Sequence, residues 1–215
     1  MQDGQNLFDP ATAHAGDWRL RGSLESSAQG VEAIIVGVWN GGAERIAEYS
    51  PFADAKNGGG RGDLYLAFLI ETLKPMIDGR FQTRPERSQT GIAGSSMGGL
   101  ISLYGFFRHP GAFGFTAALS PSVWFADRAI LSFITAAAFV AGRIHLDVGV
   151  LEGEPHVTNV RRVRDVILAK GYRCAQDLQY LEDADGAHHE AAWGRRFPAA
   201  LAFLLAGSLP DRGEP

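Results

Sequence analysis

The sequence has little cysteine, and that absence excludes several classes of protein. A single thiol, Cys174, stands among 215 residues. One cysteine cannot form an intrachain disulfide or a metal site built from several thiolates. No base lies near Cys174 in the sequence to activate its thiol, so we expect a small core residue there.

An excess of positive charge is also missing. The formal net charge is -4 and the isoelectric point is about 5.9, with the arginines scattered along the chain. A protein that binds a nucleic-acid backbone usually carries a basic stripe or patch. We therefore expect no nucleic-acid partner.

Long apolar runs are absent as well. The longest stretch, residues 129–141, is interrupted by Ser132 and Thr135 and is well short of the roughly 20 residues that a membrane span requires. We predict a buried helix there and no membrane span.

The first residues show neither the basic region nor the apolar core of a signal peptide. This favours a cytoplasmic location and leaves open a leader upstream of the given start.

Compact apolar runs alternate with helical patterns along the chain. The length and the 46% hydrophobic content suit one core, so we treat residues 1–215 as a single domain. Strands are predicted at residues 31–38, 88–93, 113–119, 144–151 and 177–181, and helices at residues 64–77, 97–107 and 157–168. Such alternation is typical of an α/β fold with a mostly parallel sheet and helices on both faces. Functional residues then gather at the carboxyl ends of the strands.

A glycine-serine turn follows the second predicted strand. Residues 94–98 (GSSMG) fit G-x-S-x-G, in which a sharp strand-to-helix turn exposes the serine hydroxyl above the sheet. The flanking glycines allow a backbone approach that side chains would block. We predict Ser96 as a nucleophile at the N-terminus of a buried helix. Ser95 competes for that role, but its side chain is expected to point back along the strand.

A serine nucleophile needs a base, which in this arrangement comes late in the chain, after an acid. His188 and His189 lie in a loop after the last predicted strand, where a base can reach back over the sheet. His156 flanks a predicted loop or helix end, and we interpret it as a structural or surface residue. No histidine follows at the spacing of H-E-x-x-H, so we predict no metal site. The glycine-rich residues 57–62 lack the Gly-Lys-Ser/Thr ending of a phosphate loop, so no nucleotide cofactor is expected either.

The acid is expected after the strand at residues 144–151. The carboxyl end of that strand delivers Glu152, which we choose. Glu154 lies two residues further out, and Asp147 lies inside the strand as a candidate buried hydrogen-bonding group. Asp127, after the preceding strand, is a further alternative.

Five segments of the chain form a familiar set: residues 3–9 (DGQNLFD), 48–51 (EYSP), 94–100 (GSSMGGL), 120–122 (SPS) and 188–193 (HHEAAW). Together they resemble the Putative esterase family, which includes enterochelin esterases, the esterase D group and feruloyl esterases. The resemblance implies an α/β-hydrolase fold with His188, rather than His189, as the catalytic histidine and Glu152 at the acid position. It also implies an oxyanion hole formed by the amide of Met97 and that of Gly4 or Gln5.

The same resemblance implies strands ahead of the DGQN segment, whereas the given sequence begins with that segment. A strand absent from that place leaves a slot between residues 31–38 and 88–93, with ladder groups unpaired on both sides. We therefore expect a fragment or a misplaced start.

The sequence thus predicts a serine esterase acting on a small-molecule ester, without a cofactor. Trp124 and Trp18 lie near predicted strand ends or site loops and are candidate walls of its pocket, although each can equally be a core residue. Two alternatives stay open: an acyltransferase to an alcohol acceptor, and an inactive fragment or binding module on the same scaffold.

Overall fold

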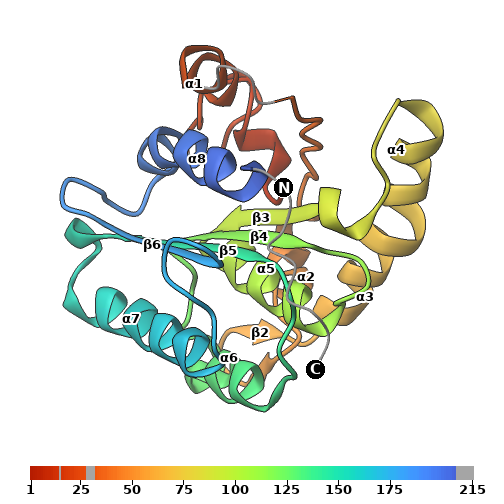
Figure 1. Cartoon of the computed structure of the whole chain (residues 1–215). Coiled ribbons are helices and arrows are strands. Elements are labelled where there is room, and N and C mark those ends of the chain that lie inside the picture. The colour runs from red at the N-terminus through yellow and green to blue at the C-terminus, as the bar shows by residue number, and fades with distance from the viewer. Residues whose placement is uncertain (15, 28–31, 207–215) are drawn as a thin grey trace.

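A four-stranded parallel sheet forms the centre of the fold (Figure 1). The computed structural model describes residues 1–14, 16–27 and 32–206. The strand order is β3-β4-β5-β6, and every neighbouring pair is parallel. The bounds are β3 Gly91–Ser95, β4 Phe115–Leu119, β5 Arg143–Gly149 and β6 Leu178–Asp183. Four of the five predicted strands are therefore confirmed, each within a few residues, and so is the α/β class.

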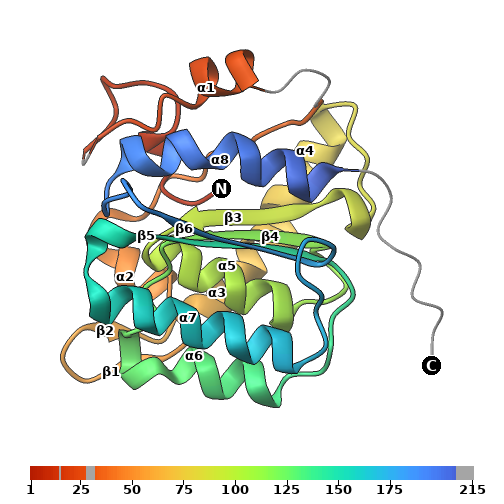
Figure 2. The ribbon, with the colours of Figure 1, turned by 60° about the vertical axis from the view of Figure 1, so that its left-hand side comes forward.

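Helices cover both faces of this sheet (Figures 1 and 2). On one face lie α5 (Met97–Arg108), α6 (Phe125–Ala136) and α7 (Glu154–Ala169), and on the other lie α1 (Leu20–Ser27) and α8 (Glu190–Leu205). The remaining elements are η1 (Gly4–Asn6), η2 (Gly42–Glu44), α2 (Arg45–Glu48), β1 (Ala53–Asp54), β2 (Gly58–Gly59), α3 (Gly62–Ala67), η3 (Phe68–Leu73), α4 (Lys74–Arg80), η4 (Arg87–Gln89) and η5 (Val150–Glu152). Within the described ranges, no helix has the length and apolar character needed to cross a bilayer.

The apolar core has two parts, one on each face of the sheet. The larger part includes the side of α7 that the sequence predicts, with Val157, Val160, Val163 and Ile167 all buried. The smaller part lies between α8 and the sheet and includes apolar side chains of α8 itself. Its members include Leu7, Trp18, Leu20, Trp193, Phe197, Leu201 and Leu204. Residues 97–107 of α5 are buried all round, as their composition predicts. The sheet is thus covered on both faces, and its carboxyl ends stay accessible for a site.

Two smaller predictions are wrong. The helix expected over residues 129–141 ends at Ala136, because Ala137 turns to an extended conformation that leads toward β5. Only one side of it is buried, at Ile130 and Ile134, since its other side faces solvent. Cys174 is exposed rather than in the core, because it lies in the turn that precedes β6.

Residues 31–38 were expected to form a central strand, and this prediction is also wrong for residues 32–38, the part that the structure describes. They belong to no strand, and no strand in the described part of the chain pairs with them. Instead, Val38 donates its N–H to the Met1 carbonyl, and the Met1 ammonium donates to the Val36 carbonyl. Gln2 N–H donates to Ala93 of β3 on the other side. The first residues of the chain therefore lie between residues 36–38 and β3.

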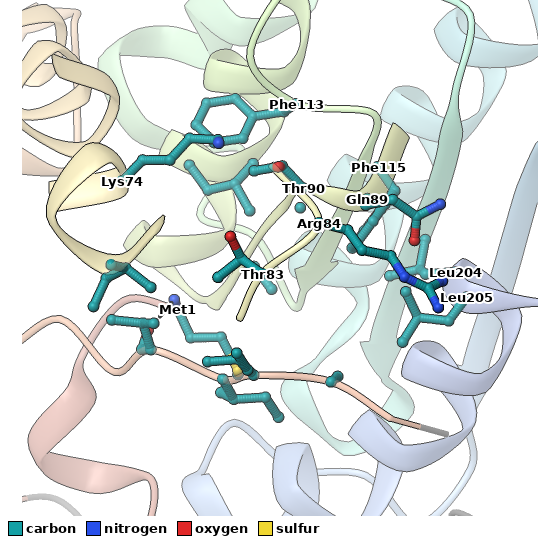
Figure 3. Close-up of a pocket in the computed structure, with 18 of the residues that line it drawn as sticks. Met1, Lys74, Thr83, Arg84, Gln89, Thr90, Phe113, Phe115, Leu204 and Leu205 are labelled. Atoms are coloured by element: carbon teal, nitrogen blue, oxygen red, sulfur yellow. Dashed lines mark hydrogen bonds between the residues drawn. The ribbon is translucent and has the colours of Figure 1, made fainter. Parts of the chain in front are cut away.

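A cavity of about 1210 Å³ continues from this short bridge, between residues 32–36 and the start of β3 (Figure 3). It lies where the sequence analysis places a slot in the sheet. Ile34 on its wall is 53% exposed, although its run of apolar residues is typical of a buried strand. The lining includes none of Ser96, Glu152 and His188. This cavity is therefore separate from the residues predicted to carry the chemistry.

Candidate active site

Ser96 occupies a strained turn between β3 and α5. Its φ of 55° and ψ of -123° lie in a region that residues with a side chain rarely adopt. Its N–H donates to the Leu119 carbonyl of the neighbouring strand at 3.0 Å, which fixes the turn against the sheet. Ser95, the competing nucleophile, is only 4% exposed. The turn thus presents Ser96, rather than Ser95, at the carboxyl edge of the sheet.

Gly94, two residues before Ser96, is required by close packing. A Cβ on Gly94 would lie 2.8 Å from the Gly98 carbonyl carbon and 2.6 Å from Gln2 Oε1. Both distances are below those that real Cβ atoms show. The steric reason given for the sequence motif is therefore visible in the structure.

Replacing Gly94 by alanine is expected to lower the free energy of unfolding by about 1–3 kcal/mol, because the added methyl group overpacks the turn. Gly79, inside α4, is the matched control, since a Cβ there meets nothing within 4 Å. Gly79→Ala should be neutral or stabilise the protein by up to about 1 kcal/mol through helix propensity. Urea unfolding of both variants measures the difference. Equal stability of the two would contradict the close packing described here.

Three residues that are far apart in the sequence meet above the carboxyl ends of the strands. His188 Nε2 lies 3.0 Å from Ser96 Oγ, and His188 Nδ1 lies 2.7 Å from Glu152 Oε2. Ser96 follows β3, Glu152 ends η5 after β5, and His188 lies in the loop between β6 and α8. The structure thus brings together the serine, histidine and acid that the sequence analysis selects.

Glu152 is held on both carboxylate oxygens. Oε1 accepts hydrogen bonds from Ser120 Oγ and from Gly149 N–H, the latter at 2.8 Å. Its side chain is 1% exposed. Burial alone raises the pKa of Glu152, but the hydrogen bonds from His188, Ser120 and Gly149 outweigh it, so the pKa is lowered from its ordinary value. Glu152 is therefore a carboxylate at neutral pH.

The alternative acids lie elsewhere. The Glu154 side chain is 73% exposed and pairs with Arg161, and that of Asp127 is 89% exposed beside Arg128. Asp147 is fully buried and paired with Arg196, as a structural carboxylate inside a strand should be.

His189 caps a helix instead of facing the serine. Its Nδ1 accepts a hydrogen bond from Ala192 N–H at the start of α8, at 3.3 Å. Of the two neighbouring histidines in the loop, His188 alone is within hydrogen-bond distance of Ser96 and Glu152.

A buried polar network holds Glu152 on the side of its Oε1 atom, and the sequence analysis does not predict this network. Arg196 on α8 is 4% exposed and binds both oxygens of Asp147, with distances of 3.0 and 2.9 Å. It also donates to Ser120 Oγ at 2.9 Å, as does Trp193 Nε1 at 3.0 Å. With both donors on its oxygen, the Ser120 hydroxyl can direct its own hydrogen to Glu152. The network therefore ties the acid to the core.

Two further polar side chains touch the site directly. Ser122 Oγ lies 3.1 Å from Ser96 Oγ, and its N–H donates to the Ser96 carbonyl. His156 Nε2 lies 3.1 Å from Glu152 Oε2. His156 was interpreted from the sequence as a structural or surface residue, although its spacing of four residues from Glu152 is a signal that could have found it. Donor atoms of Glu152, His156 and His188 lie within 4.8 Å of one another, close enough to hold a metal ion.

The DGQN segment forms η1 beside the nucleophile turn. Asp3 accepts two hydrogen bonds from the Arg45 guanidinium, at 2.8 and 2.7 Å, which anchors the segment. Gly4 N–H donates to the Val38 carbonyl at 2.8 Å, so it is already engaged. Among the described residues no hydrogen-bond acceptor is found for the amides of Gln5 and Met97. Of the predicted oxyanion donors, Gln5 and Met97 are therefore the available pair.

The two candidate pocket tryptophans differ in exposure. Trp124 precedes α6, just after Ser122, and is 48% exposed. Trp18 is 3% exposed and packs on Trp193 and Phe197, with ring centroids 6.0 and 5.9 Å away. Trp18 is thus a core residue rather than an accessible wall, because α8 covers it.

Comparison with known proteins gives a family match over nearly the whole chain. The model of the family described as Putative esterase matches residues 1–204.

Individual relatives are distant. An uncharacterised protein of Bacillus subtilis, YbbA, is 25% identical over 95% of this chain and 83% of its own length. A siderophore enterobactin esterase of Emericella nidulans is 28% identical over 72% of this chain, and the match spans 59% of that enzyme. The solved structure of the BES protein from Bacillus cereus superposes with a TM-score of 0.71 at 23% identity, covering 94% of this chain and 80% of that one. The structural likeness supports the fold.

Proposed function

The chain belongs to the Putative esterase family, and from that premise we propose that it hydrolyses a carboxylic ester through an acyl-enzyme. Ser96 is the nucleophile, His188 the general base and Glu152 the acid that orients the imidazole. The observation that carries this assignment is the unbroken chain of contacts from Ser96 Oγ to His188 Nε2, at 3.0 Å, and from His188 Nδ1 to Glu152 Oε2, at 2.7 Å.

Acylation begins with attack of Ser96 Oγ on the ester carbonyl carbon, while the hydroxyl proton passes to His188 Nε2. Glu152 accepts from Nδ1, which fixes the tautomer with Nε2 free to take that proton. The carboxylate then stabilises the imidazolium. When the tetrahedral intermediate collapses, the carbon–oxygen bond to the alcohol breaks and His188 returns the proton to the departing oxygen. The acyl group stays on Ser96.

Deacylation repeats the sequence with water. His188 removes a proton from the water as it attacks the acyl carbon, and the Ser96 oxygen leaves and is reprotonated. The amides of Met97 and Gln5 stabilise the oxyanion in both steps, each contributing about 3 kcal/mol to the transition state. Trp124 remains our candidate for an exposed pocket wall. A scaffold used for binding alone would not need the strained Ser96 conformation, which favours the enzyme over a binding module.

The proposal is tested by the time course of p-nitrophenyl acetate cleavage. We expect turnover with a nitrophenol burst close to one per protein, and an intact mass increased by one acetyl group during the burst. Adding acceptor alcohols separates hydrolysis from acyl transfer through the products formed. A folded protein that neither turns over aryl esters nor acquires an acetyl group would contradict the proposal.

A further inference from the structure

His156 shares an oxygen atom with the histidine assigned as general base. It lies in the first turn of α7, and its Nε2 is 3.1 Å from Glu152 Oε2, the atom that also accepts from His188 Nδ1 at 2.7 Å. The His156 and His188 rings meet edge to face, with centroids 5.2 Å apart and an interplanar angle of 81°. Two imidazoles therefore converge on one carboxylate oxygen.

The neighbours of His156 define its tautomer. Besides Glu152 Oε2, the Ser120 carbonyl oxygen lies 3.3 Å from Nε2. A carboxylate and a carbonyl oxygen can only accept, so the proton of His156 must be on Nε2. Burial is the main cause that lowers the pKa of His156 below its ordinary value, with His188 acting in the same direction and Glu152 opposing it. At neutral pH His156 is thus an uncharged N–H donor.

We propose that His156 is a positioning residue, which holds Glu152 Oε2 in line with His188 by donating a hydrogen bond from Nε2 to that oxygen. This role rests on the proposed ester hydrolysis, because it acts through Glu152 and His188 and touches no reacting atom. The other oxygen of Glu152 is already fixed by Ser120 and Gly149. With His156 in place, both oxygens have a partner besides His188.

The hydrogen bond from His156 to Glu152 Oε2 also changes the electrostatics of the Glu152–His188 pair. The second N–H donor withdraws part of the negative charge with which Glu152 stabilises a protonated His188. The other charged groups facing this cluster are Arg196, 3.9 Å from Glu152 Oε1, and Asp147, which is bonded to Arg196. Glu190, at the start of α8, also interacts electrostatically with His188. On α7 itself, Glu154 is exposed and paired with Arg161. Removing the His156 donor leaves the full charge of Oε2 to His188 and favours its protonated form.

The test compares His156→Phe with His156→Gln. Phenylalanine keeps a ring but has no donor, whereas the glutamine amide nitrogen can reach the position of Nε2. For an aryl ester we expect His156→Phe to lower kcat about tenfold at nearly unchanged KM, as loss of a hydrogen bond to a charged group implies. The acid limb of its kcat/KM profile should move to higher pH. His156→Gln should recover most of kcat. Glu154→Gln, in the same turn of α7, is the control and should match the wild type.

A second readout does not depend on turnover. The Nδ1 proton of His188 is followed by NMR in the same variants and in a Ser96→Ala background. We expect its resonance to move in His156→Phe and to return toward the wild-type position in His156→Gln. An unmoved resonance and an unmoved acid limb in His156→Phe would overturn the positioning role, as would a glutamine variant that behaves like the phenylalanine one. If no ester is hydrolysed by any form, the proposed function fails, and the NMR resonance still decides whether His156 is coupled to His188.

Discussion

Replacing Ser96 by alanine is expected to lower kcat for an aryl ester by about a million-fold, the loss typical of removing the nucleophile of a serine hydrolase. The variant lacks the oxygen that forms the acyl-enzyme, and His188 has no hydroxyl to deprotonate. The fold should persist, since alanine removes only one partly buried hydroxyl, which contacts His188 and Ser122. Steady-state kinetics and thermal unfolding of the same sample measure both effects.

Ser95→Ala is the matched control for this experiment. Ser95 is the adjacent hydroxyl, 4% exposed at the end of β3, and its replacement should leave kcat within a few-fold of the wild type. The assignment of the nucleophile is wrong if Ser95→Ala abolishes turnover in a folded protein while Ser96→Ala keeps it.

The second large effect is expected for Arg196→Met, which should lower the free energy of unfolding by about 3–5 kcal/mol. Arg196 is 4% exposed, and its guanidinium is the cation beside the fully buried Asp147. Methionine has a similar length but leaves the buried Asp147 charge without its guanidinium partner. Among the described residues, the Ser120 N–H and His145 Nε2 then remain beside the carboxylate, and a buried charge that loses its ion-pair partner is costly. Urea denaturation measures the loss.

Arg195→Met provides the control, one residue away on the same helix. The Arg195 side chain is 56% exposed and pairs with Asp183, so its removal should cost no more than about 1 kcal/mol. Adding Asp147→Asn to Arg196→Met should recover part of the loss, because the unpaired charge is then gone. A change below about 1 kcal/mol in Arg196→Met would show that the buried pair contributes little to stability.

The site could be predicted from the sequence because it depends on topology. Ser96 and His188 are 92 residues apart, and His188 and Glu152 are 36 apart. Each of the three follows an apolar run that reads as a strand, and parallel strands bring their carboxyl ends to one edge. Locating the strands therefore placed Ser96, Glu152 and the neighbouring pair His188 and His189 at one edge, and the choice of His188 over His189 came from the family resemblance.

The parts that were missed depend on orientation and on neighbours. Arg195 and Arg196 are adjacent on α8, and only the rotation of the helix decides that Arg196 is buried. Residues 32–38 have the composition of a buried strand, but a strand needs hydrogen-bonding partners, and the described residues supply them only beside Val36 and Val38. His156 was assigned as a structural or surface residue. Its spacing of four residues from Glu152 points to proximity, but whether its ring reaches the carboxylate depends on how η5 turns into α7.

The most direct test of the central claim is labelling with a fluorophosphonate probe, which reacts with an activated serine hydroxyl, followed by peptide mass spectrometry. We predict a single adduct on Ser96, formed by the wild type and by Ser95→Ala and absent from Ser96→Ala. An adduct on another residue, or no adduct on a protein shown to be folded, would contradict the assignment of Ser96 as the nucleophile.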